Sequence, residues 1–298
     1  MVGSDLSGLA PSVLVRLGSL ELVARTIVEG FLGGLHRSPV KGFSVEFSEY
    51  RRYLPGDDPA RIDWKLAARS GRYYVKEFEE ETNLECHLLL DISGSMGYGS
   101  QPVTKLQYGG FLAAALACLM HRQCDGVGLM LFDDRVIESV PVGSRSGHLQ
   151  TLLSVLSKAK IGGKSDVAKP LDEIATRLRR RGLVVLISDL LDDPGAVIRG
   201  LKHLRFRGSE VIVFHVLDPA ELTFPFERVA QFEDMETASQ VIAVPSRVRQ
   251  CYLKNSEEQQ ERYRRELRLA NIDYHLVNTA KPFDDALMSY LSTRGRRA

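Results

Sequence analysis

From about residue 83 onward, short apolar runs alternate with amphipathic stretches. Runs typical of strands lie at 84–90, 127–132, 136–140, 183–188, 210–216 and 273–277. Helical spacing of apolar positions occurs near 103–123, 147–159, 168–181, 194–205, 254–270 and 281–293. This alternation predicts an α/β fold with a doubly wound, mostly parallel sheet. Only three residues separate 127–132 from 136–140, so we expect a hairpin that adds one antiparallel edge strand.

The pattern before residue 83 is different. Apolar positions between residues 14 and 32 have helical spacing, and we expect Gly30, Gly33 and Gly34 to end or bend this helix. Residues 43–47 alternate as in a strand, 55–59 have turn composition, and 73–78 suggest a returning strand. We therefore predict two regions: 1–82, with a helix and a small β-rich part, and 83–298, with a β-hairpin insertion at about 217–253.

Composition narrows the classes of function. Hydrophobic residues make up 44% of the 298, charged residues 26%, and the net charge is +1, so neither nucleic acid nor an anionic membrane is indicated as a partner. The four cysteines have no framework spacing, which favours a reducing, cytoplasmic setting. The longest apolar stretch, 111–120, is about half of what a bilayer crossing needs, so we expect no direct membrane insertion.

Candidate chemistry begins where the first strand of the 83–298 region ends. Asp91 follows the apolar run, and Ser93 and Ser95 place hydroxyls at alternating positions after it. Gly94 and Gly97 allow the loop to fold back, so that the three oxygen-bearing side chains converge. Hard oxygen ligands suit Mg²⁺ or Mn²⁺, although a polar residue after a strand is also a common helix cap.

Two further segments supply oxygen ligands in the order such a site requires. The buried-looking run 183–188 leads into Asp189, a second carboxylate at a strand end. The loop 162–166 contains Ser165 just before a predicted helix, where Ser165 is either a metal ligand or a cap of that helix. The predicted metal ligands are therefore Asp91, Ser93, Ser95, Ser165 and Asp189.

Enzyme motifs fit this loop poorly. A haloacid-dehalogenase-like phosphatase requires a second aspartate where Ser93 stands, so its general acid is missing. A serine-hydrolase elbow around Ser95 would require glycine at position 93. The Gly-Gly-Lys-Ser run at 162–165 lacks the earlier glycine of a P-loop, since position 158 is lysine.

Together these residues resemble two known patterns. The segment 91–95 (DISGS), with Ser165 and Asp189, resembles the metal-ion-dependent adhesion site (MIDAS) of von Willebrand factor A domains. The upstream region resembles the signature of the domain-of-unknown-function 58 (DUF58) family, through residues including Ser38-Pro39, Gly42, Phe47, Glu49-Tyr50-Arg51, Tyr53, Pro55-Gly56-Asp57-Asp58, Arg61-Ile62-Asp63-Trp64-Lys65 and Ala68-Arg69. The third loop usually supplies threonine in A domains, whereas Ser165 stands here.

The resemblance implies a function that composition does not. It implies a non-enzymatic adaptor or co-chaperone that works with a MoxR-type AAA+ ATPase in assembly or activation of client proteins. In such a site, neutral serine ligands leave a bound Mg²⁺ under-neutralised, so an acidic residue of a client protein can complete its coordination. Two alternatives remain: a metal-dependent phosphohydrolase on the same sheet, and a structural interaction module that needs no metal.

Overall fold

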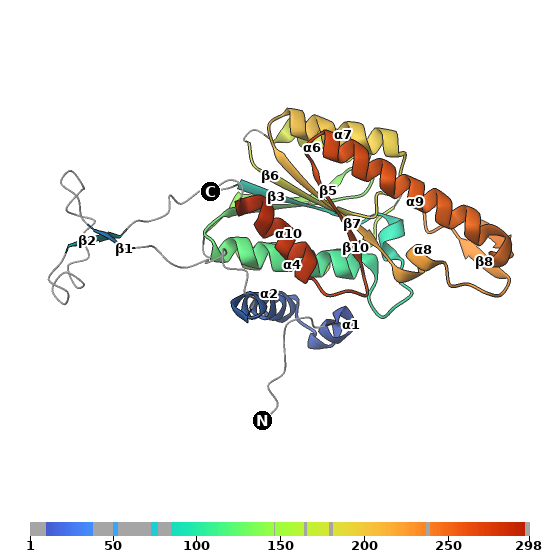
Figure 1. Ribbon diagram of the computed structural model, residues 1–298, viewed down its shortest axis with the longest axis horizontal. Coiled ribbons are helices and arrows are strands. Elements are labelled where there is room, and N and C mark those ends of the chain that lie inside the picture. Colours follow the sequence, from blue (N-terminus) through green and yellow to red (C-terminus); the bar gives the residue numbers. More distant parts are fainter. Residues whose placement is uncertain are drawn as a thin grey trace, which may run out of the picture.

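The computed structural model describes residues 10–37, 50–52, 73–76, 85–145, 147–163, 166–178, 181–236 and 239–295. Its centre is a six-stranded sheet with helices on both faces (Figure 1). The strand order is β10-β7-β6-β3-β4-β5. The strands are β3 (Glu85–Asp91), β4 (Gly126–Phe132), β5 (Val136–Gly143), β6 (Leu183–Ser188), β7 (Glu210–Leu217) and β10 (Asp273–Asn278).

The predicted fold class is confirmed. Neighbouring strands pair in parallel except β4 and β5, which form the expected antiparallel edge. The inner strands are apolar along their length because both faces of the sheet are covered. In β3, Leu88 and Leu90 join one core cluster while Leu89 joins the other, as the two-residue period of a strand requires.

Each face of the sheet carries its own set of helices (Figure 1). One face is covered by α4 (Lys105–Arg122), α5 (His148–Lys158) and α10 (Asp284–Gly295). The other is covered by α6 (Ala168–Arg177), α7 (Pro194–Phe206) and α9 (Pro245–Leu269). None of the helices in the described part of the chain combines the length and apolar character needed to cross a membrane.

An N-terminal helical segment extends the first of these cores. It comprises α1 (Pro11–Leu14), the 3-10 helix η1 (Val15–Leu17) and α2 (Leu20–Arg37). The three glycines Gly30, Gly33 and Gly34 do not end the helix, because α2 continues through them to Arg37. Each glycine costs about 1 kcal/mol in a helix, but α2 buries Val28 and Phe31 in the core that it shares with α4.

Few residues between α2 and β3 are described. Strands β1 (Tyr50–Arg52) and β2 (Tyr74–Lys76) pair antiparallel, which places a strand within the returning segment predicted at 73–78. The strand predicted at 43–47 and the turn at 55–59 lie outside the described residues, as do most of the family-signature residues.

The region 217–253 contains the predicted hairpin, but its limits change. After the short helix α8 (Pro219–Thr223), strands β8 (Ala230–Glu233) and β9 (Gln240–Ala243) pair antiparallel. Helix α9 then begins at Pro245 rather than at 254, with proline in the first turn. Its start was missed because only Pro245, Tyr263 and Leu267 are buried along it, which leaves little apolar periodicity. Helix α6 ends at Arg177, earlier than the predicted 181.

Candidate functional site

Asp91 is the last residue of β3, which lies between β4 and β6 in the middle of the sheet. Its side chain is fully buried. The Ser93 backbone N–H donates to Asp91 Oδ1 at 2.8 Å, and the Ser188 hydroxyl donates to Asp91 Oδ2 at 2.5 Å. Because Ser188 ends the neighbouring strand β6, the two strand ends hold the carboxylate from both sides.

Two serine hydroxyls follow Asp91 within a tight turn. The 3-10 helix η3 (Gly94–Gly97) begins directly after Ser93 and folds the chain back at the strand end. Ser93 Oγ and Ser95 Oγ lie 3.1 Å apart, and both side chains are almost fully buried. The sequence prediction that these hydroxyls converge is confirmed by this distance.

Asp189 lies at the end of β6, next to β3, and is also buried. Its Oδ1 accepts from the Leu191 backbone N–H at 3.2 Å. Burial, and after it the negative charge of Asp189, raises the pKa of Asp91 to about 7. The structure therefore brings the two predicted carboxylates into one buried region, where their charges oppose each other.

The third predicted loop lies against the first. The Gly94 backbone N–H donates to Gly163 O at 2.9 Å, and the Gly162 N–H donates to Ile92 O at 2.6 Å. The Gly163 N–H also faces Asp133 Oδ2 at 3.3 Å. Ser165, the predicted ligand of this loop, lies outside the described residues.

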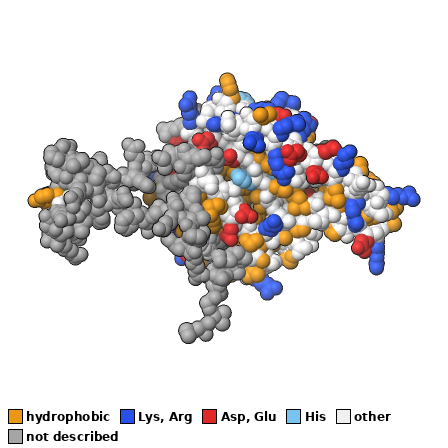
Figure 2. Space-filling model, viewed as in Figure 1, with side chains coloured by type: hydrophobic (Ala, Val, Ile, Leu, Met, Phe, Trp, Pro, Cys, Tyr) orange, Lys and Arg blue, Asp and Glu red, His pale blue; other side chains and the backbone are white. Residues whose placement is uncertain are grey.

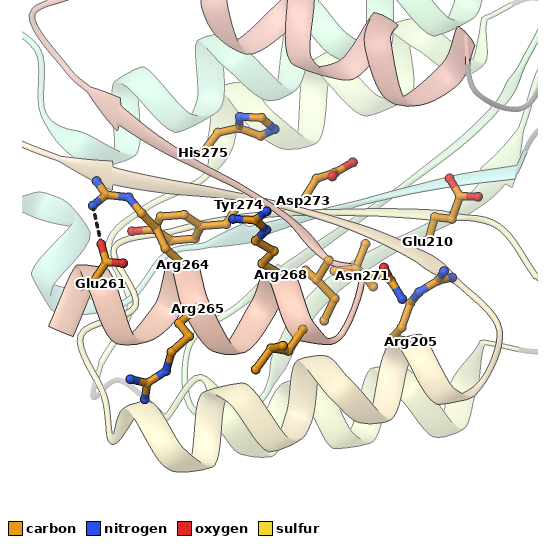
Figure 3. A pocket seen from close by; sticks show the side chains of 13 residues that line it. Arg205, Glu210, Glu261, Arg264, Arg265, Arg268, Asn271, Asp273, Tyr274 and His275 are labelled. Atoms are coloured by element: carbon orange, nitrogen blue, oxygen red, sulfur yellow. Dashed lines mark hydrogen bonds and ion pairs between the residues drawn. The ribbon is translucent and has the colours of Figure 1, made fainter. Parts of the chain in front are cut away.

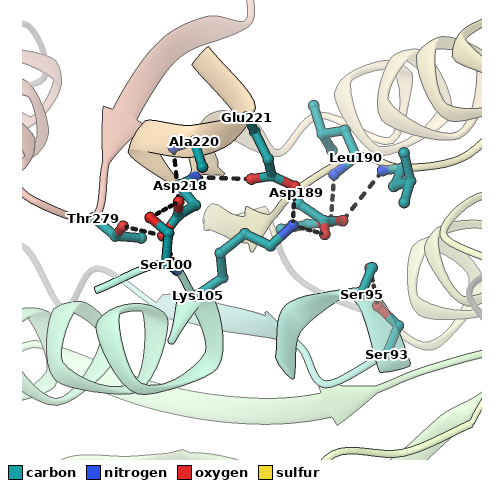
Figure 4. Close-up of polar contacts among 12 residues, drawn as sticks. Ser93, Ser95, Ser100, Lys105, Asp189, Leu190, Asp218, Ala220, Glu221 and Thr279 are labelled. Carbon is teal, nitrogen blue, oxygen red and sulfur yellow. Dashed lines mark hydrogen bonds and ion pairs between the residues drawn. The ribbon is translucent and has the colours of Figure 1, made fainter. Parts of the chain in front are cut away.

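Lys105 is a member of the site that the sequence did not reveal. It is the first residue of α4 and is 1% exposed. Its Nζ lies 2.7 Å from Asp189 Oδ2 and 2.7 Å from Glu221 Oε1 on α8. Figure 4 draws the Lys105 ammonium between these two carboxylates. Burial alone would lower the pKa of this ammonium, but the charges of Asp189 and Glu221 outweigh burial and raise it. A lysine near a helix start is usually solvated, so no local pattern marks this one.

The buried side-chain oxygens of this site fit a hard divalent cation. Among the described residues, no group of three His, Cys, Asp or Glu side chains is placed to hold a metal ion, so a metal here would need the serine hydroxyls. Asp91, Ser93, Ser95 and Asp189 present oxygen only, which Mg²⁺ prefers. Burial, and after it the charge of Asp189, raises the pKa of Asp91, and a cation between the two carboxyl groups would offset their negative charge.

A larger hollow exists, but it lies elsewhere. A groove of about 1190 Å³ opens beside the C-terminal part of α9 and the start of β10 (Figure 3). Its lining mixes arginines with acids, and Arg264 forms an ion pair with Glu261 at 3.2 Å. Ligands of parallel sheets bind at the carboxyl ends of strands, whereas Asp273 and Glu210 place this groove at the amino ends of β10 and β7.

Comparison with known proteins identifies the family. The model of the family described as "Protein of unknown function DUF58" matches residues 49–262, more than two thirds of the chain. This chain belongs to the DUF58 family. The uncharacterized protein Rv1480 of Mycobacterium tuberculosis is 30% identical over 230 residues, which cover 76% of this chain and 72% of Rv1480. The resemblance stated from residues 38–69 is thereby confirmed at the level of the family.

One solved structure shares the α/β type of fold. The crystal structure of the conserved hypothetical protein BatB from Bacteroides thetaiotaomicron matches with a TM-score of 0.51 at 15% identity, over 72% of this chain and all of that chain. The SpRpn10 VWA domain matches with a TM-score of 0.38 at 13% identity, over 69% of this chain and 94% of that domain. With its six-stranded, mostly parallel sheet, this DUF58 protein has a von Willebrand factor A-like fold.

Proposed function

We propose that this DUF58 protein is a non-enzymatic adaptor that binds acidic segments of other proteins through a Mg²⁺-dependent site at the carboxyl ends of β3 and β6. The observation that carries the proposal is the buried cluster of Asp91, Ser93, Ser95 and Asp189. Mn²⁺ has similar ligand preferences and would be accepted as a substitute.

The charged and the neutral residues of the site have different roles in metal binding. Asp91 and Asp189 supply the negative charge that holds a cation, while Ser93 and Ser95 supply neutral oxygens. A bound Mg²⁺ would supply positive charge that these ligands only partly neutralise, which favours a carboxylate from a partner as a further ligand. The η3 turn holds both hydroxyls at the carboxyl end of β3, so the protein contributes a preformed set of oxygen ligands. Binding of this kind is reversible and depends on the metal.

The proposed partners are a MoxR-type AAA+ ATPase and a client protein that presents an acidic residue. The MoxR assignment follows from the family resemblance, and the acidic residue follows from the charge of the site. A cytoplasmic setting agrees with the state of the cysteines as thiols: Cys86 and Cys118 are buried, and Cys124 and Cys251 are exposed. On the face that Figure 2 shows, Lys and Arg lie interspersed with Asp and Glu, without a uniform basic surface for nucleic acid.

Metal binding is the first test of the proposal. Isothermal titration with Mg²⁺, and with Mn²⁺ as a second probe, should give one site in the wild-type protein. The double substitution Ser93→Ala and Ser95→Ala should weaken binding by at least about tenfold, because it removes two oxygen ligands. Ser154→Ala is the matched control, since Ser154 is exposed on α5. Equal affinity of the double variant and the control would remove the serines from the site.

Partner capture separates this proposal from a metal-independent interaction module. The module has one observation in its favour, since Lys105 already places a buried positive charge on Asp189. We expect a MoxR-type ATPase from the same organism to be retained by the immobilised protein with Mg²⁺ and lost with EDTA. Equal retention in both buffers would favour the metal-independent module.

A phosphatase assay tests the absence of enzymatic activity. We expect no turnover of p-nitrophenyl phosphate with Mg²⁺, because Ser93 stands where the general acid of a phosphatase is required. Turnover that disappears in Asp91→Ala would instead support a metal-dependent phosphohydrolase.

A further inference from the structure

The hairpin of β8 and β9 is anchored firmly to the body of the domain. Phe232 on β8 packs against Phe224 and Phe226, and Phe224 also contacts Tyr252 on α9. The Arg249 guanidinium donates to Phe224 O at 3.0 Å and to Phe226 O at 2.7 Å. Aromatic packing and these hydrogen bonds restrict how the hairpin can be placed.

The tip of this hairpin lies directly on the Asp91–Ser95 loop. A Cβ atom at Gly94 would lie 2.8 Å from Met235 O and 3.3 Å from Glu236 Cγ. A Cβ atom at Gly97 would lie 3.1 Å from Met235 Cε. Because glycine has no side chain, the loop accepts the hairpin tip at a distance that other residues would prevent.

This contact places the Glu236 side chain against Gly94, the residue between the two serines. Gly94 separates Ser93 from Ser95, and Glu236 Cγ, which packs on Gly94, is one bond from the carboxyl carbon. Within the hairpin turn, the Glu236 backbone N–H donates to Asp234 Oδ1 at 2.8 Å, and the Asp234 N–H donates to Ser239 O at 2.8 Å. Glu236 Oε1 is shielded from solvent.

The carboxyl groups around this loop outnumber the positive charges described beside them. The Lys105 ammonium offsets only one of the two charges on Asp189 and Glu221, and Asp91 adds another carboxyl group. A further carboxyl group beside this loop adds negative charge, which a cation lying among these groups would offset.

We infer that Glu236 is an intramolecular ligand of the proposed metal site, filling the position that an acidic residue of the partner takes during binding. This inference rests on the proposed function, because it requires a cation at Asp91, Ser93, Ser95 and Asp189. A partner carboxylate then has to displace Glu236, so the hairpin sets the threshold for partner binding. The partner must bind more tightly than a tethered carboxylate of the same chemistry.

The test compares Glu236→Gln with Glu233→Gln, a matched loss of charge on the same hairpin at an exposed residue. Mn²⁺ is the probe. We measure its affinity for the protein and the relaxation rate of water protons in the presence of the bound ion. Loss of a carboxylate ligand should weaken Mn²⁺ binding by about tenfold in Glu236→Gln. It should also raise the relaxation rate, because water enters the vacated position, and added acetate should reverse the rise. The Glu233→Gln protein should match the wild type in all three measurements.

The outcomes distinguish the inference from the function on which it rests. If wild type binds Mn²⁺, the Ser93→Ala and Ser95→Ala double variant does not, and Glu236→Gln behaves like Glu233→Gln, the inference fails and the metal site stands. If wild type does not bind Mn²⁺, both fail. Melting temperatures in EDTA should agree among the wild type and the two glutamine variants, which ensures that affinity rather than folding is compared.

Discussion

Lys105 shows how one residue can determine the electrostatics of a whole site. The side chain is buried with Asp189 and Glu221, two carboxylates on different elements, so it joins the end of β6 to α8 through one ammonium group (Figure 4). Removal of one partner from a buried ion pair is costly, because the remaining charges lose their compensation in a region of low dielectric. The stability of the metal-free protein therefore depends on Lys105.

Lys105→Met should lower the free energy of unfolding by about 3–5 kcal/mol in EDTA, because the buried Asp189 and the partly buried Glu221 lose their counter-charge. Urea unfolding measures the change. Excess Mg²⁺ should restore part of the loss, since the cation can balance Asp189. The control Lys202→Met removes a surface pair with Glu266, in which the side chains are 43% and 29% exposed, and should cost at most about 1 kcal/mol. Equal effects of the two substitutions would show that the buried Lys105 pair contributes no more to the free energy of unfolding than the surface pair.

His87 gives the protein a predictable response to acid. It lies in β3, away from Asp91, and burial lowers its pKa, with Glu85 opposing the effect by raising it. Below the ordinary pKa of about 6.5, the unfolded chain binds a proton at this position more readily than the folded protein. Stability is therefore lost as the pH falls below this value. Between pH 7.5 and 5.5, His87→Gln should lose less of its free energy of unfolding than the wild type, as measured by urea unfolding. An equal loss in both proteins would contradict a lowered pKa for His87.

At the scale of elements, α4 organises one face of the sheet. Its residues from Leu112 to Met120 are all buried, since it is covered by the sheet on one side and by neighbouring helices, including α2, on others. The helix starts with a capping box, in which the Thr104 and Gln107 side chains each bond the backbone of the other. This start is also what positions Lys105. Helix α2 contributes Val28 and Phe31 to the same core, so it packs against the domain that contains the sheet.

Packing of α2 against α4 can be measured by one substitution. Phe31→Ala should lower the free energy of unfolding by about 3–5 kcal/mol, because it leaves a cavity at a side chain that is 3% exposed. Leu22→Ala on the same helix is the control, since Leu22 is 51% exposed, and it should change stability by at most about 0.5 kcal/mol. A cost for Phe31→Ala as small as that of the control would indicate that α2 is detached from the domain in solution.

At the scale of the molecule, the strand order brings distant segments to one place. Because β3 lies between β6 and β4, residues 91–95 meet residues 188 and 189 at the same edge of the sheet. The 162–163 loop and the hairpin tip approach the same point from other parts of the chain. A cation held there would connect segments that are otherwise far apart in sequence, and would stabilise the native state as a whole.

Mg²⁺ at a hundred times its dissociation constant should raise the free energy of unfolding by about 2.7 kcal/mol. For a domain of this size, this corresponds to an increase in Tm of about 5–10 °C. Differential scanning calorimetry in Mg²⁺ and in EDTA measures it. Asp91→Asn should abolish the increase, because it removes a carboxylate ligand. A Tm that rises equally in wild type and Asp91→Asn would place the binding of Mg²⁺ elsewhere.

The sequence by itself determined the class of fold and the first part of the site. Alternation of apolar runs with amphipathic stretches is a local property, so it predicted the strands of the sheet and most of its helices. The oxygen-rich segment Asp91, Ser93 and Ser95 is also local, and its place at a strand end follows from the pattern. Its pairing with Asp189 could be predicted because adjacent parallel strands end at the same edge of the sheet.

Only the tertiary structure decided the rest. Helix α2 continues through its three glycines because it packs against α4. Local helix propensity does not include this packing. The partners of Lys105 are 84 and 116 residues away in sequence, and Glu236 reaches Gly94 only because the hairpin folds back onto the loop. Burial and charge compensation are properties of the assembled core. The same lysine or glutamate in an exposed position would be an ordinary solvated side chain.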